Sequence, residues 1–94
     1  MKPLTKKERE TIAKVLAETF DTKDVVVARV PDSKRYRVGI VAREFEKMSP
    51  MSRQEKLWKL VKDTVGKDAT LKLTLIHAYA PSEVESPEAF IAAN

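Results

Sequence analysis

The sequence predicts a single α+β domain, residues 1–94, in which helices cover one face of a mixed three-stranded sheet. Three observations support this fold class. Segments with helical and strand periodicity follow one another in the order α-β-β-α-β, followed by either a terminal helix or a frayed end. A short turn joins the first two strands, which makes them an antiparallel hairpin. A helix joins the second and third strands, which makes that pair parallel with a right-handed crossover.

The first element is a helix over residues 5–20. Thr5 and Glu8 have the spacing of a capping box, in which each side chain accepts a hydrogen bond from a backbone amide of the other residue. Apolar residues then recur at helical spacing, at Ile12, Val15, Leu16 and Phe20. We therefore expect this helix to pack one face on the sheet.

Two strands follow, at residues 24–30 and 36–43. The first is rich in β-branched valine, and the second alternates between two faces. One of these faces carries Tyr36, Val38, Ile40 and Ala42. Residues 31–35 between the strands are typical of a turn, because proline presets φ and the aspartate and serine bond to their own backbone. These features predict the hairpin.

A second long helix is predicted over residues 50–65. Ser49 is a capping residue, and it precedes a proline at the position where proline is favoured in helices. Ser52 and Glu55 offer a second capping box one turn later. Gly66 suits the residue that follows a helix.

An alternation of leucine with polar residues predicts the last strand, over residues 70–79. The leucines are Leu71, Leu73 and Leu75. His77 is in phase with them, and we therefore expect it to be partly buried. Beyond Pro81, residues 82–92 form either a short C-terminal helix or a frayed end.

The composition is that of a globular domain with a mixed-charge surface. Hydrophobic residues make up 43% of the chain, charged residues make up 34%, and the net charge is +4. Spanning a membrane takes about 18 consecutive apolar residues, and no run approaches that length. The first ten residues are polar and lack the apolar core of a signal peptide. We therefore expect a cytoplasmic protein, either a monomer or a weak dimer.

The sequence contains no pattern typical of catalysis or metal binding. It has no cysteine, which excludes a disulfide and a thiolate metal site. His77 is the single imidazole and is interpreted as a strand residue rather than a ligand. Glu8 and Glu55 are explained as helix caps, no catalytic triad is evident, and no glycine-rich phosphate loop occurs. The sequence thus indicates a protein that is not an enzyme and binds no cofactor.

Three short patterns occur in order along the chain. They are the strand 38–42, a loop and helix start with Phe45, Ser49 and Arg53, and a strand end at residues 79–83. In this order and at this spacing they resemble the BolA family, whose fold is similar to that of class II KH domains. The resemblance covers almost the whole chain and implies the fold predicted above. It also implies pairing with monothiol glutaredoxins around a shared iron–sulfur cluster, and some bacterial members of the family bind DNA.

The chain departs from the family where the resemblance would place cluster ligands. The ligating histidine corresponds to Lys72, and a second ligand in the hairpin loop falls near Lys34 or Arg35. Gln54 stands where the family has another histidine. Iron in such clusters requires thiolate or neutral imidazole ligands, which protonated lysine and arginine cannot supply. We therefore expect that this chain ligates no cluster.

Two functions are consistent with these features. The first is a small regulatory protein that binds a protein partner, such as a monothiol glutaredoxin-like protein, through the loop and second helix. Tryptophan is enriched in interface hot spots, so Trp58 is either an anchor for the partner or the margin of the core. The predicted contact residues are Phe45, Met48, Ser49, Arg53 and Trp58.

The alternative is a KH-like nucleic-acid-binding module that uses the basic hairpin. A helix N-terminus with a nearby arginine can hold a phosphate, and the positive net charge permits such binding. A KH domain clamps its nucleotides with a G-x-x-G loop, which this sequence lacks. The predicted contact residues are Arg29, Lys34, Arg35, Arg37 and Arg53.

Overall fold

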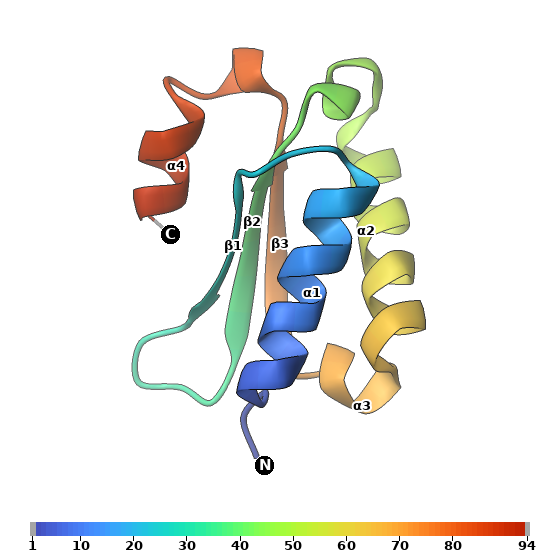
Figure 1. The fold of residues 1–94 in the computed structure, drawn as a ribbon, viewed down its shortest axis with the longest axis vertical. Coiled ribbons are helices and arrows are strands. Elements are labelled where there is room, and N and C mark those ends of the chain that lie inside the picture. The colour runs from blue at the N-terminus through green and yellow to red at the C-terminus, as the bar shows by residue number, and fades with distance from the viewer. Residues whose placement is uncertain (1, 94) are drawn as a thin grey trace.

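The structure is a computed structural model that describes residues 2–93. Its helices are α1 (Lys6–Thr19), α2 (Pro50–Val65), α3 (Lys67–Thr70) and α4 (Pro87–Ala93), and its strands are β1 (Val25–Arg29), β2 (Tyr36–Val41) and β3 (Leu73–Tyr79) (Figure 1). Two 3-10 helices are η1 (Arg43–Lys47) and η2 (Pro81–Glu83). The central strand β2 pairs antiparallel with β1 and parallel with β3. The predicted α+β class with a mixed three-stranded sheet is thus confirmed.

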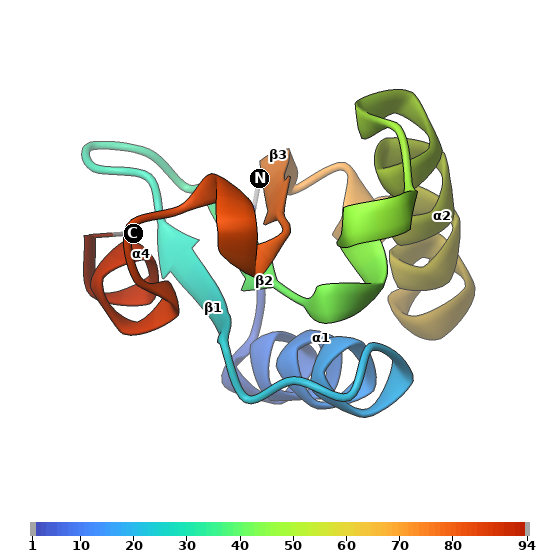
Figure 2. The same ribbon diagram turned by 90° about the horizontal axis from the view of Figure 1, so that it is seen from above.

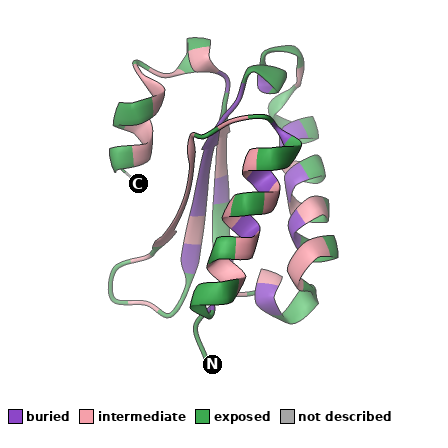
Figure 3. Cartoon of the chain, in the orientation of Figure 1, coloured by how far each residue is buried: buried purple, intermediate pink, exposed green. Residues whose placement is uncertain are grey.

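The core lies between one face of the sheet and helices α1 and α2, whose inward sides are buried (Figure 3). Val38 and Ile40 of β2 point to this face and are fully buried. Leu16 of α1 and Leu57 of α2 are also fully buried. The apolar stripe that the sequence predicts on α1 and the buried side of α2 therefore form the main core. Within residues 2–93, no helix is long and apolar enough to cross a membrane.

The helix starts follow from their capping residues. The amide of Thr5 donates to Glu8 Oε1 at 2.9 Å, and the amide of Glu8 donates to Thr5 Oγ1 at 3.1 Å, which completes the predicted capping box of α1. Ser49 caps α2 by accepting from the amide of Ser52 at 3.1 Å. Ser52 is therefore inside the first turn, and the second capping box predicted at this residue does not form.

The strand predicted over residues 70–79 begins later, because a short helix precedes it. Gly66 has φ of 89°, a conformation that ends α2 and is accessible mainly to glycine. The chain then makes a further turn, in which the amide of Thr70 donates to the carbonyl of Gly66 at 3.1 Å. Ala69 of this turn is buried, whereas Leu71 lies outside the strand and is 59% exposed.

A register shift between β2 and β3 decides which leucines are buried. Thr74 has no partner in β2, although residues on either side of it do. An unpaired residue reverses the alternation of faces beyond it. Leu73 is consequently 5% exposed and Leu75 is 38% exposed, while Ile76 takes the core position. The regular alternation predicted for this strand is therefore wrong, and the half-buried His77 faces away from the core.

The C-terminal segment forms two short helices rather than one over residues 82–92. Helix α4 begins at Pro87, because Ser86 Oγ accepts from the amide of Ala89 at 3.0 Å and proline suits the first helical position. Figure 2 shows α4 beside β1, on the opposite side of the sheet from α1. Helices therefore lie on both faces of the sheet, and not on one face as the sequence suggests.

Phe90 packs α4 against the sheet directly over Gly39. A Cβ atom at Gly39 would lie 3.1 Å from Val26 Cγ1 and 3.2 Å from Phe90 Cε2. These distances are shorter than ordinary van der Waals contacts between carbon atoms. Glycine therefore permits the close approach of the aromatic ring to β2.

Replacing Gly39 with valine should loosen α4. The added carbon atoms would displace the ring of Phe90, and overpacking of this kind costs about 1–3 kcal/mol. Amide hydrogen exchange in residues 87–93 should accelerate in Gly39→Val, and the unfolding midpoint should fall. Thr74→Val places the same side chain at an exposed position of β3 and serves as the control. Unchanged protection of α4 in Gly39→Val would contradict the Phe90 contact.

Candidate functional site

The segment from η1 to the first turns of α2 packs against the C-terminal end of β3, and Arg53 lies at this junction. Arg53 is 5% exposed. Its Nε donates to the carbonyl of Met48 at 3.2 Å, and its Nη2 donates to the carbonyl of Phe45 at 2.5 Å. Its Nη1 donates to the carbonyl of Ala78 in β3 at 3.1 Å. One side chain therefore joins η1, the start of α2 and the end of β3.

Glu83 of η2 completes the hydrogen bonding of this guanidinium. Its Oε1 accepts from Arg53 Nη1 at 2.6 Å, and its Oε2 accepts from Nη2 at 3.1 Å. A guanidinium has five N–H donors, and these contacts together with those to the three carbonyls use all of them. Arg53 therefore has no donor left for a phosphate or for a partner.

The same contacts control the charge of Glu83. The hydrogen bond from Arg53, followed by that from the Ala80 amide at 2.7 Å, holds the pKa of the Glu83 carboxyl below its ordinary value of 4.5. The Glu83 side chain is 42% exposed, so water partly screens its interaction with Arg53. At neutral pH the Glu83 carboxyl is thus ionised, and the hydrogen bonds that it accepts from Arg53 are of the stronger, charge-assisted kind. Sequence reasoning did not pair these residues, although both belong to the patterns that carry the family resemblance.

The five residues predicted to contact a partner divide between interior and surface. Phe45 is fully buried, with the guanidinium carbon of Arg53 5.6 Å from its ring centre. Met48 and Trp58 are half-buried, and Ser49 is exposed while it caps α2. Phe45 and Arg53 therefore shape this corner of the molecule from within. Met48, Ser49 and Trp58 are the members of the set that reach its surface.

A stripe on α2 connects this corner with the edge of β3. Met51, Gln54 and Trp58 have the spacing i, i+3, i+7, so they share one face of the helix, and we name them the α2 stripe. Gln54 Oε1 accepts from Trp58 Nε1 at 3.0 Å, and Gln54 Nε2 donates to the carbonyl of Ile76 at 2.8 Å. Met51 is 72% exposed, the highest value for a large hydrophobic residue within residues 2–93. The stripe is thus anchored in the middle and apolar at both ends.

A groove of about 230 Å³ separates the start of α2 from β3. Gln54 of the α2 stripe lines it, and the partly exposed Tyr79 forms part of its other side. The remaining lining residues are Pro50, Arg53, Ile76, His77, Ala78 and Glu83. The groove therefore extends the surface of the α2 stripe toward the edge of the sheet.

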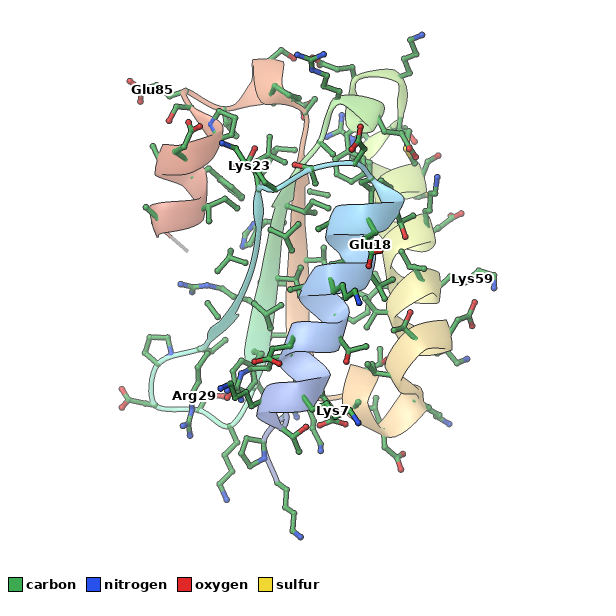
Figure 4. The ribbon with its side chains drawn as sticks, in the orientation of Figure 1. Lys7, Glu18, Lys23, Arg29, Lys59 and Glu85 are labelled. Atoms are coloured by element: carbon green, nitrogen blue, oxygen red, sulfur yellow. The ribbon has the colours of Figure 1, made fainter. Side chains whose placement is uncertain are left out.

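The predicted basic residues do not form one surface. Arg29 lies at the hairpin end of the sheet (Figure 4) and is paired with Tyr36, whose side chain faces the core side. Arg37 is the next residue of β2 and therefore faces the opposite side. Arg35 donates to a backbone carbonyl at 2.9 Å. Arg53 is bonded to the other end of β3, so the structure does not bring it together with the hairpin.

The residues at the positions of the family's cluster ligands lie close together at the hairpin end. The carbonyl of Lys72 accepts from the amide of Tyr36, and Arg35 Nη1 donates to the carbonyl of Leu71. Lysine and arginine supply no ligand for iron, and His77 lies further along β3. Within residues 2–93 no group of three or more His, Cys, Asp or Glu residues could hold a metal ion. This donor set does not fit an iron–sulfur cluster.

Comparison with solved structures identifies the fold. BolA1 from Arabidopsis thaliana superposes with a TM-score of 0.66 and 21% sequence identity, over 82% of this chain and 95% of that one. The BolA domain of SufE1 from Arabidopsis thaliana superposes with a TM-score of 0.65 and 22% identity, over 86% of this chain and 99% of that one. No protein-family model and no curated protein matches the sequence. The chain therefore has the BolA fold, as the resemblance predicts, at low sequence identity.

Replacing Arg53 with methionine should destabilise the protein by about 2–4 kcal/mol. The carbonyls of Phe45 and Ala78 and the carboxylate of Glu83 would lose their donors inside a tightly packed corner. Denaturant unfolding of Arg53→Met measures this loss. Arg43→Met removes an exposed cation and should change the unfolding free energy by no more than about 0.5 kcal/mol. A similar decrease in the free energy of unfolding in the two variants would show that the Arg53 contacts stabilise the fold no more than an exposed arginine does.

Replacing Glu83 with glutamine should reduce the sensitivity of the protein to acid. A carboxyl whose pKa is lowered by folding stabilises the folded state above its unfolded pKa, and this contribution is lost as the pH falls through the folded pKa. The unfolding temperature of the natural protein should therefore drop as the pH falls below 4.5, and it should drop less in Glu83→Gln. Glu85→Gln, which alters an exposed neighbour, is the control and should retain the original pH dependence.

Proposed function

We propose that this chain with the BolA fold is a small non-enzymatic interaction protein that binds a protein partner through the α2 stripe and the adjoining groove. Its role is regulatory, in the sense that it acts by association rather than by chemistry. The observation that supports the proposal most directly is the 72% exposure of Met51, which lies on the same face of α2 as the half-buried Trp58. Methionine and tryptophan that reach the surface on one helix face are typical of protein contact surfaces.

The arrangement of the corner supports this choice of surface. Arg53 and Glu83 hold the start of α2 against β3, so the α2 stripe is presented on a fixed backbone. A rigid surface loses little conformational entropy on binding. Met48 and Ser49 lie at the N-terminal end of the stripe and extend the contact surface. Phe45 and Arg53 contribute indirectly, because they set the position of the residues that a partner touches.

The solved structures are consistent with such a role. In SufE1 the BolA fold occurs as one domain of a protein. The family resemblance makes a monothiol glutaredoxin-like protein the first partner to test. Since Lys72 and Arg35 cannot ligate iron, the association proposed here depends on surface contacts and not on a cluster held by this chain. The cytoplasmic location and the monomeric or weakly dimeric state stay predictions.

Co-expression with a monothiol glutaredoxin, followed by calorimetry on the purified proteins, tests the proposal. Met51→Glu places a charge in the centre of the contact and should weaken binding at least about tenfold, or about 1.4 kcal/mol. Leu71→Glu makes the same kind of change at a leucine that is 59% exposed near the hairpin end, and it should bind as the natural protein does.

Three results would count against the proposal. Equal effects of Met51→Glu and Leu71→Glu would mean that the α2 stripe is not the contact surface. Absence of any association would remove the glutaredoxin-like partner. Visible absorption of an iron–sulfur cluster that appears only when this chain is present, and not with the glutaredoxin alone, would show that this chain contributes ligands to iron.

A further inference from the structure

The sulfur-containing side chains of residues 2–93 have two different environments. The sequence contains no cysteine and three methionines, of which Met1 lies outside the described residues. Met48 is half-buried and packs against the core. Met51 is 72% exposed and does not belong to the core cluster. Water and small solutes therefore reach the sulfur of Met51 much more readily than that of Met48.

Met51 lies where its side chain can change without disturbing the fold. It is the second residue of α2, directly after Pro50, and the start of this helix is fixed by other residues. Ser49 Oγ accepts from the amide of Ser52 at 3.1 Å, and the carbonyl of Ser49 accepts from the amide of Arg53 at 3.0 Å. Chemical modification of the Met51 thioether should therefore leave the stability of the fold unchanged.

A thioether is oxidised by peroxides to a sulfoxide, and biological reductases reverse this change. A sulfur lone pair attacks one oxygen of hydrogen peroxide, so that an S–O bond forms and the O–O bond breaks. The leaving hydroxide takes the proton of the attached hydroxyl and departs as water. Sulfur loses two electrons and the peroxide gains them. In the reverse direction the oxygen leaves as water while two thiols become a disulfide. An apolar side chain is thus made polar and then restored.

The donor groups near Met51 on the α2 stripe already have acceptors. Trp58 Nε1 donates to Gln54 Oε1 at 3.0 Å, and Gln54 Nε2 donates to the carbonyl of Ile76 at 2.8 Å. The guanidinium of Arg53 is also fully bonded. A sulfoxide oxygen on Met51 would therefore depend on water, and an apolar partner surface that covered it would leave it without a hydrogen bond. Oxidation should thus oppose binding at this surface.

We propose that Met51 is a reversible oxidation site that controls binding at the α2 stripe. The thioether form binds the protein partner, and the sulfoxide form releases it. This inference rests on the proposed function, because it assigns a regulatory chemistry to the same surface. Oxidation takes place on the free protein, in which Met51 is exposed, and a bound partner protects the sulfur. Since the chain has no cysteine, its reversible response to oxidants depends on methionine and not on a disulfide.

Mass spectrometry of peptides from the whole chain, after treatment with hydrogen peroxide, tests the selectivity of the site. The sulfoxide should form several times faster at Met51 than at Met48. The unfolding temperature should not change while Met51 alone is oxidised. Equal rates at the two residues, or an unfolding temperature that falls as Met51 is oxidised, would overturn the proposal. This measurement needs no partner and is therefore independent of the proposed function.

Calorimetry with the monothiol glutaredoxin tests the effect on binding. Only this chain is treated with peroxide, and the peroxide is removed before the glutaredoxin is added, so that the partner is not oxidised. The oxidised protein should bind at least about tenfold more weakly than the untreated protein. Treatment with the two methionine sulfoxide reductases, one for each epimer, should restore the affinity.

Two leucine variants assign the effect to one residue. Leucine has nearly the size of methionine but contains no sulfur. The affinity of Met51→Leu for the glutaredoxin should be the same before and after peroxide treatment. The affinity of Met48→Leu, the matched control, should fall on treatment by the same factor as that of the natural protein. A loss of affinity in treated Met51→Leu would assign the effect to another residue and would overturn the proposal.

The results distinguish this inference from the proposed function. If the untreated protein binds the glutaredoxin and oxidation of Met51 does not change the affinity, this inference alone is overturned. If the untreated protein does not bind, the proposed function is overturned and the regulation of the stripe with it. A loss of affinity that the reductases do not reverse would indicate damage instead of regulation, and it would also overturn the inference.

Discussion

The hydrogen bonding of the Arg53 guanidinium is the interaction on which the rest of the structure depends. A buried cation is tolerated when every donor is satisfied, and here three carbonyls and one carboxylate meet that requirement. The acceptors come from η1, from the loop before α2, from the end of β3 and from η2. The geometry of one planar group therefore fixes how four segments meet, and it does so at the corner where the family resemblance is strongest.

Two of the residues that carry the family resemblance therefore have a structural role and are not available to contact a partner. Phe45 and Arg53 are interior residues. The side chains that reach the surface at this corner belong to neighbours such as Met51 and Trp58. The Arg53 contacts and the positions that correspond to the cluster ligands, such as Lys72, are physically independent, since they lie at opposite ends of β3. A chain can therefore keep the BolA fold while its donor set no longer fits a cluster.

The sheet gives the molecule two surfaces of different character. The core side is sealed by α1 and α2, and the α2 stripe lies at its margin. The other side is covered by Phe90, which packs over Gly39 and against the rings of His77 and Tyr79. The register shift at Thr74 is responsible for much of this difference, because it turns Leu75 away from the core and toward the same face as Arg37. One unpaired residue thus determines which side chains of β3 lie on the face of the sheet opposite α1 and α2.

The sequence by itself determined the type and order of the main elements, the capping of α1 by Thr5 and of α2 by Ser49, and the mixed pairing of the three strands. These features depend on periodicity and on contacts within a few residues, which a sequence displays directly. The tertiary structure decided the pairing of Arg53 with Glu83, the register of β3 and the face on which α4 packs. Each of these joins groups far apart in the chain, 30 residues in the case of Arg53 and Glu83, and is selected by burial and hydrogen bonding in the assembled fold. The sequence predicted a contact surface at the corner around Arg53, but only the structure separated the residues that support this corner from those that reach its surface.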